Sequence, residues 1–120
     1  MKKRRTAHRY PYQARLYIVA AEYGCYPVVT RDVSANGVGV FLKQDVLDAL
    51  GERGITMEVG DALQLAPTQD AGSSASMDCH ITSLRRLSQK NYLMGLMWAD
   101  ENTAARPVIQ EMLKEARARG

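Results

Sequence analysis

CYPVVTRDVSANGVGVFL, residues 25–42, contains two runs rich in β-branched and apolar residues, joined by a turn signal. The runs cover residues 25–33 and 38–42, and their composition favours extended backbone. Between them lies Asn36-Gly37, a dipeptide that strongly indicates a two-residue hairpin loop. This stretch therefore predicts an antiparallel hairpin, from which the rest of the fold can be built outward.

Further strand-like runs lie on both sides of this hairpin. Residues 12–21 precede it, a short run covers 62–65, and residues 77–87 and 92–98 form a second hairpin pattern. Gly39 leaves room for a bulge or a bend in a closing sheet. About six short strands separated by turns predict a small antiparallel barrel.

Two segments have helical rather than strand-like spacing of their apolar residues. The first lies within residues 44–56, where Asp45 is expected to act as the N-cap. The second runs from Thr103, another expected N-cap, to the end of the chain. Its apolar stripe consists of Val108, Ile109, Met112, Leu113 and Ala116. We therefore expect a mainly β fold, a six-stranded antiparallel β-barrel with a C-terminal α-helix.

Positive charge is concentrated at the N-terminus. The chain has 120 residues, enough for one domain, and a formal net charge of +3. Its first nine residues include Lys2, Lys3, Arg4, Arg5 and Arg9, so the remainder is slightly acidic. This distribution predicts a basic ligand-binding arm over residues 1–11 and a barrel domain over 12–120. It suits capture of a small anion better than tracking of a nucleic-acid duplex.

Several other functions lack support in the sequence. Cys25 and Cys79 are isolated thiols, which are expected to stay reduced in a cytoplasmic protein. The longest apolar run, residues 16–21, is far below membrane-spanning length. His8 and His80 have no partners at metal-ligand spacing. No paired acidic residues, phosphate-binding loop or nucleophile elbow is present, so we expect neither an enzyme nor a metal protein.

Two short motifs carry the chemistry that remains. Arg5 and Arg9 are four residues apart, which puts them on one face of either a strand or a helix. Arginine offers paired hydrogen bonds to phosphate and to the O6/N7 edge of guanine. Asp32, Ser34 and Gly37 form an Asp-x-Ser-x-x-Gly turn that adds a carboxylate acceptor, a hydroxyl and close backbone approach.

In this order the two motifs resemble the PilZ domain, whose signature is Arg-x-x-x-Arg followed by Asp/Asn-x-Ser-x-x-Gly. Gly95 also resembles the glycine of that family's last strand. PilZ domains are six-stranded barrels with a C-terminal helix, and they bind the bacterial second messenger cyclic di-GMP. The resemblance therefore implies the same fold that the strand count predicts.

The resemblance also implies a role for each motif residue. Arg5 and Arg9 would grip phosphate and the Hoogsteen edge of a guanine, and Asp32 would accept hydrogen bonds from guanine N–H groups. Ser34 would bond a polar edge of the ligand, and Gly37 would let the backbone turn beneath it. In the family, an arginine at the position of Arg4 tends to accompany capture of an intercalated cyclic di-GMP dimer. Two ligand molecules per chain are therefore expected.

These inferences converge on a cytoplasmic, non-catalytic cyclic di-GMP receptor or adaptor without a cofactor. Ordering of its arginine arm would transmit the level of second messenger to an effector, or to the rest of a larger chain. Neither a nucleic-acid polymer nor membrane insertion is expected. The alternatives are a small barrel that binds single-stranded nucleic acid through its arm, and a PilZ-like module that acts only as a protein adaptor.

Overall fold

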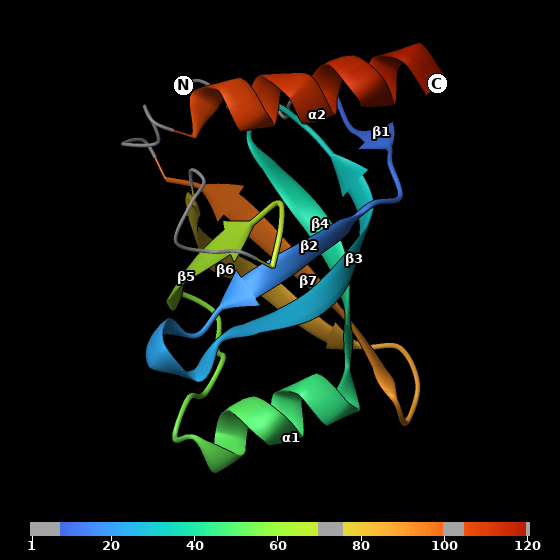
Figure 1. Cartoon of the computed structure of the whole chain (residues 1–120). Helices are drawn as coiled ribbons and strands as arrows, with labels where there is room; N and C mark the ends of the chain where they lie inside the picture. The colour runs from blue at the N-terminus through green and yellow to red at the C-terminus, as the bar shows by residue number, and fades with distance from the viewer. Residues whose placement is uncertain (1–7, 70–75, 100–104, 120) are drawn as a thin grey trace, which may run out of the picture.

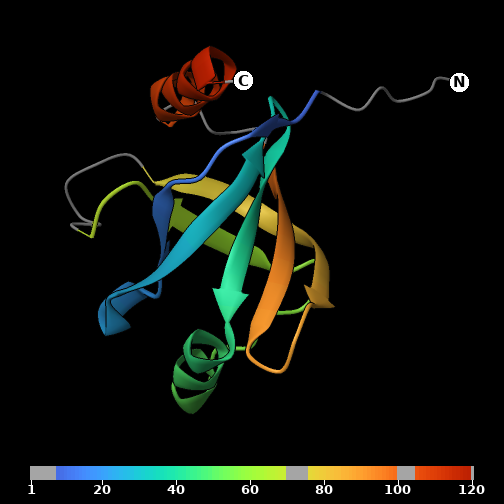
Figure 2. The same cartoon turned by 90° about the vertical axis from the view of Figure 1, so that its right-hand side faces the viewer.

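The computed structural model describes residues 8–69, 76–99 and 105–119 and shows a closed barrel with a helix at each end (Figures 1 and 2). Its elements are β1 (Tyr10–Pro11), β2 (Arg15–Val19), the short 3-10 helix η1 (Ala21–Tyr23), β3 (Cys25–Val33), β4 (Gly37–Lys43), α1 (Gln44–Glu52), β5 (Ala62–Ala66), β6 (Met77–Arg86), β7 (Asn91–Trp98) and α2 (Arg106–Arg119).

Six antiparallel strands close the barrel in the order β3-β2-β5-β6-β7-β4, and pairing between β4 and β3 completes the ring. The expected six-stranded barrel with a C-terminal helix is thus confirmed. The two-residue strand β1 lies outside this ring and pairs with the end of β3, placing Pro11 opposite Asp32. The last two residues of the predicted arm therefore belong to the sheet.

The core lies inside the barrel, where alternate residues of each strand point inward. These side chains include Ile18, Val28, Val38, Val40, Leu42, Leu65, Met77, Ile81, Met94 and Leu96, each at most 3% exposed. Helix α2 covers one end of the barrel and α1 lies at the other (Figure 1). The expected apolar stripe of α2 is confirmed, because Ile109, Met112, Leu113 and Ala116 are buried and Val108 is partly buried against the core.

Two local expectations are wrong. Helix α1 is preceded by Lys43 at the N-cap position, without a side-chain cap bond, and Asp45 lies inside the first turn. There its carboxylate still interacts favourably with the helix dipole. The second error concerns the β3–β4 hairpin. Its loop is Ala35-Asn36, closed by a hydrogen bond from the Ser34 N–H to the Gly37 carbonyl. Gly37 is therefore the first residue of β4 rather than part of the loop.

Helix α2 begins at Arg106, and Thr103, its expected cap, lies outside the described residues. The first strand is shorter than expected. Only Arg15–Val19 forms β2, because the preceding segment leaves the barrel wall and is held by Thr30 of β3. The N–H of Thr30 donates to the Ala14 carbonyl at 2.8 Å, and the Thr30 Oγ1 accepts from the Ala14 N–H at 2.9 Å.

Candidate ligand-binding site on the barrel wall

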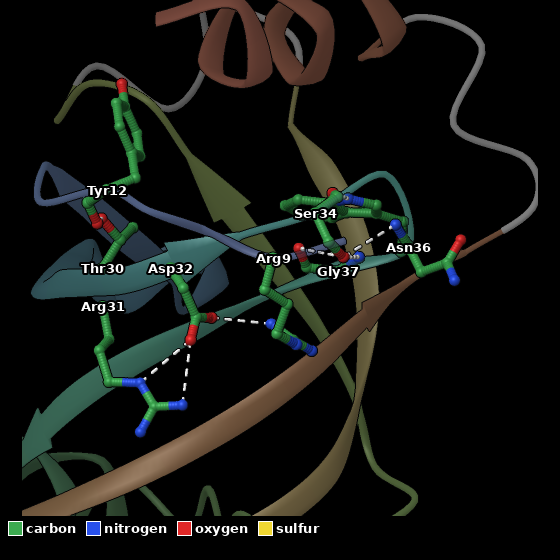
Figure 3. Close-up of polar contacts among 9 residues, drawn as sticks. Arg9, Tyr12, Thr30, Arg31, Asp32, Ser34, Asn36 and Gly37 are labelled. Atoms are coloured by element: carbon green, nitrogen blue, oxygen red, sulfur yellow. Dashed lines mark hydrogen bonds and ion pairs between the residues drawn. The ribbon is translucent and has the colours of Figure 1, made fainter. Parts of the chain in front are cut away.

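The Asp32 carboxylate lies on the outer wall of the barrel between two arginines (Figure 3). The Nη1 of Arg9 donates to its Oδ1 at 2.7 Å. Arg31 contacts the other oxygen, Oδ2, from its Nε at 3.1 Å and its Nη2 at 3.0 Å. The Asp32 side chain is 11% exposed, whereas those of Arg9 and Arg31 are 43% and 49% exposed. Two cations that water can reach thus flank one sheltered anion.

A bulge in β3 explains how consecutive residues can meet in this way. Neighbouring strand residues normally point to opposite faces of a sheet. The register between β3 and β4 shifts between Thr30 and Asp32, so Arg31 is an extra residue in the ladder. The bulge turns the side chains of Arg31 and Asp32 to the same outer face. Sequence reasoning missed Arg31 as a residue of this candidate site. The signal that could have indicated it is Gly39, because a glycine inside a strand is typical of a bulge.

Ser34 builds the hairpin turn and is only 1% exposed. Its Oγ accepts hydrogen bonds from the N–H groups of Asn36 and Gly37, each at 3.1 Å. The Trp98 indole N–H donates to the Ser34 carbonyl at 3.3 Å, which ties the turn to the end of β7. The structure therefore places this hydroxyl inside the turn that carries Asp32, rather than on the solvent side.

Gly37 and Gly39 are required by close packing. A Cβ on Gly37 would lie 2.0 Å from the carbonyl oxygen of Leu96 in β7. A Cβ on Gly39 would lie 2.8 Å from Oδ1 of Asp32. The first glycine therefore lets β4 and β7 approach, and the second makes room for the carboxylate.

Of the six predicted site residues, the structure brings Arg9 and Asp32 into contact and places Ser34 and Gly37 in the adjoining turn. Arg4 and Arg5 lie outside the described residues. The binding roles of all six stay predictions.

The segment that follows Arg9 is fastened both to β3 and to α2. The Tyr12 N–H donates to the carbonyl of Arg31 at 3.1 Å. The Tyr12 hydroxyl donates to Oε1 of Glu115 at 2.7 Å, and the Arg119 guanidinium lies 5.4 Å from the Tyr12 ring centre. Arg117 stacks similarly on Tyr10 at 5.8 Å. These contacts of Tyr10 and Tyr12 form a clamp between the arm and the C-terminal helix.

The clamp has a testable dependence on pH. Burial, followed by the hydrogen bond to Glu115, raises the pKa of Tyr12 to about 12. An unfolded tyrosine titrates near about 10. Stability from this group is therefore complete below pH ~10 and lost as the pH rises toward ~12, because the unfolded chain gives up the proton first. The free energy of unfolding should fall more steeply across this window in the wild type than in Tyr12→Phe.

Denaturant titrations at a series of pH values would measure both slopes. Burial also raises the pKa of Cys79 to about 12, but this thiol is present in both proteins and cancels in the comparison. Equal slopes for the two proteins would contradict the burial of the Tyr12 hydroxyl and its hydrogen bond to Glu115.

A groove adjoins the hairpin turn on the side of α2. It is lined by the loop residues Ala35 and Asn36, by residues 97–99 at the end of β7, and by α2 residues that include Arg106 and Gln110. The surface beside the turn is therefore shaped partly by α2.

Within the described ranges, no helix is long and apolar enough to cross a membrane. The same residues contain no cluster of three or more His, Cys, Asp or Glu side chains that can hold a metal ion. A closed six-stranded barrel with a C-terminal helix, carrying two arginines around one carboxylate on its wall, defines a small antiparallel β-barrel domain.

The profile of the PilZ domain family matches residues 3–115, and the chain belongs to this family. PilZ domains bind cyclic di-GMP and act as binding or adaptor domains rather than as enzymes. A search of curated proteins finds no match. Among solved structures, the chain is similar to the Bacillus subtilis inhibitor of motility MotI/DgrA, with a TM-score of 0.63 and 16% sequence identity. That match covers 98% of this chain but 51% of the other, so the chain spans about half of that protein's length.

Proposed function

We propose that this chain is a cyclic di-GMP receptor that binds its ligand on the outer wall of the barrel, beside Asp32. The observation that carries the proposal is the 2.7 Å contact between Arg9 and Asp32, which joins the two family motifs across 23 residues. Their contact assembles a cation for phosphate and an acceptor for guanine at one place on the surface.

Binding would proceed by an exchange of partners. The Arg9 guanidinium, already partly exposed, would leave Oδ1 of Asp32 for a phosphate or for the Hoogsteen edge of a guanine. The freed carboxylate oxygen would accept hydrogen bonds from guanine N–H groups. Arg5 would add a second cation, and the turn built by Ser34 and Gly37 would hold Asp32 in place.

The family relation also supports capture of two ligand molecules. Arg4 directly precedes Arg5, which adds a cation for the four phosphates of an intercalated dimer. Isothermal titration calorimetry with cyclic di-GMP is expected to give a stoichiometry near two per chain. Arg4→Ala should shift it toward one while binding continues. A wild-type value near one would remove the role of Arg4 but keep the receptor.

No binding of cyclic di-GMP by the wild-type chain would overturn the receptor itself. A parallel titration with a single-stranded oligonucleotide, repeated at increasing salt, distinguishes the receptor from the alternative of a nucleic-acid-binding barrel. Salt-sensitive binding of the oligonucleotide alone would favour a nucleic-acid-binding barrel.

Transmission to an effector would pass through the clamp on α2. Arg9 immediately precedes Tyr10, and the rings of Tyr10 and Tyr12 contact arginines of the C-terminal helix. A change in the conformation of the arm would therefore alter the support of α2 and the groove beside the turn. This is a switch in which ligand binding rearranges one segment and presents a different surface to a partner. The partner expected to bind that surface is an effector protein or the rest of a larger chain.

The same proposal includes three properties that follow from the receptor role. The chain is expected to have no catalytic activity, to need no cofactor besides its nucleotide ligand, and to work in the cytoplasm where the messenger is found.

A further inference from the structure

The two carboxylate oxygens of Asp32 are held by different parts of the chain. Oδ1 accepts from Arg9, which lies in the arm just before β1. Oδ2 accepts from Arg31, a residue of β3 and therefore of the barrel itself. One partner precedes β1 and lies outside the strands of the barrel, while the other belongs to the same strand as the carboxylate.

Arg31 is well anchored at its backbone. Its carbonyl accepts the Tyr12 N–H at 3.1 Å, and Thr30 on one side and Asp32 on the other are paired with β4 opposite Val40 and Gly39. The bulge between these two pairs is what directs the Arg31 side chain toward Oδ2. Its guanidinium presents both Nε and Nη2 to that single oxygen, which restricts rotation of the carboxylate.

The surroundings of Oδ1 are different, because a glycine leaves space beside it. The Cβ that Gly39 lacks would lie 2.8 Å from Oδ1. Gly39 pairs with Gly95 on β7, so no side chain rises from the next two strands at this level of the wall. Oδ1 thus has a partly exposed partner from outside the barrel strands and a bare backbone next to it.

We propose that Arg31 is the positioning residue of the site. By holding Oδ2 of Asp32, it orients Oδ1 to accept hydrogen bonds from the ligand once Arg9 has exchanged Asp32 for the ligand. The inference rests on the proposed function and deepens it, since it assigns guanine recognition to one oxygen and orientation to another residue. Arg31 also keeps the sheltered carboxylate paired throughout the exchange. A carboxylate that is 11% exposed and has no cationic partner would be costly to maintain.

This role predicts an effect on base discrimination as well as on affinity. Guanine offers two neighbouring donors on its Watson–Crick edge, N1–H and the 2-amino group, whereas N1 of adenine is an acceptor. A correctly oriented carboxylate therefore favours cyclic di-GMP over cyclic di-AMP. A rotating carboxylate loses that preference, while hydrogen bonds to phosphate are unaffected.

The experiment is a pair of calorimetric titrations, with cyclic di-GMP and cyclic di-AMP, on wild type, Arg31→Ala, Arg31→Lys and Arg15→Ala. Arg15 is an exposed arginine of β2, so its variant controls for removal of one positive charge on the neighbouring strand. Arg31→Ala is expected to weaken cyclic di-GMP binding by about ten- to a hundredfold, the effect of losing one charge-assisted hydrogen bond between guanine and a misoriented Asp32. It should also lower the ratio of the affinities for cyclic di-GMP and cyclic di-AMP. Arg31→Lys should restore part of the affinity and part of the discrimination between the nucleotides, because an ammonium can still bond Oδ2.

The outcomes separate this inference from the receptor proposal. Absence of wild-type binding overturns the receptor and, with it, the inference. Normal wild-type binding with Arg31→Ala unchanged would show that Arg31 is an ordinary surface ion pair and would overturn the inference alone. Equal weakening toward both nucleotides would mean that Arg31 contacts phosphate directly, and this too would overturn the positioning role. Thermal unfolding of each variant shows whether it is folded.

Discussion

Arg9→Ala is expected to abolish micromolar binding of cyclic di-GMP while leaving the barrel folded. The guanidinium is proposed to make at least one charge-assisted hydrogen bond to the ligand, and removing such a bond costs about 1.5–3 kcal/mol, or roughly one to two decades of affinity. The effect of the substitution on stability should be below about 1 kcal/mol, because the ion pair with Asp32 is formed by an arginine that is 43% exposed. Calorimetry and thermal unfolding measure the two effects separately.

A matched arginine elsewhere controls for the change in charge. Arg53 follows α1 at the opposite end of the barrel from α2, and its guanidinium stacks on Tyr23 at 5.1 Å. Arg53→Ala is therefore expected to bind cyclic di-GMP like the wild type. Arg5→Ala should behave like Arg9→Ala if both arginines of the family motif grip the ligand. Unchanged affinity in Arg9→Ala would remove the proposed site.

Gly37→Ala is expected to cause the largest loss of stability, about 3 kcal/mol, among substitutions of the motif residues. The added methyl group would lie 2.0 Å from the Leu96 carbonyl oxygen and 3.1 Å from the Met97 Cα, both backbone atoms. Relief requires the paired strands β4 and β7 to separate at this point of the barrel wall. Because typical domains are stable by only about 5–15 kcal/mol, the variant should lose a large share of its stability. Urea titration followed by circular dichroism measures this change.

Gly51→Ala is the matched control for this substitution. Gly51 lies in α1, a Cβ there would meet no atom within 4 Å, and its backbone is helical. Alanine should therefore be neutral or stabilise the protein by up to about 1 kcal/mol, because it favours helix more than glycine does. Equal stability of Gly37→Ala and wild type would show that β4 and β7 are less closely packed than the structure indicates.

The sequence predicted most of the barrel because its signals are local. Runs rich in β-branched and apolar residues, separated by turn signals, marked β3, β6 and β7, and the helical stripe marked α2. The errors also have local causes. Asp45 resembles an N-cap in type, yet α1 begins one residue before it without a side-chain cap. The Asn-Gly signal indicated the correct hairpin, but Gly37 lies in the strand rather than in the loop. There it packs closely against the Leu96 carbonyl of β7.

The candidate site was predicted in composition and only partly in arrangement. Motif order indicated that Arg9 and Asp32 belong to one site, and the structure joins them at 2.7 Å. Arg31 was missed because simple alternation in a strand sends neighbouring residues to opposite faces. The hydrogen bond expected from Ser34 to the ligand stays a prediction, and in the structure its hydroxyl is buried and accepts from the Asn36 N–H.

Residues close together in the chain determine several features of this protein. They are the order of elements, the strand count, the basic arm and the presence of Asp32 in a short motif. Backbone propensity and side-chain periodicity act over a few residues, so they leave a visible pattern there. The partners of each group depend instead on strands that meet only in the closed barrel. The bulge that pairs Arg31 with Asp32, the contact of Gly37 with Leu96 and the clamp of Tyr12 on Glu115 arise at such meetings. These contacts depend on the register between strands, and packing of the whole core sets that register.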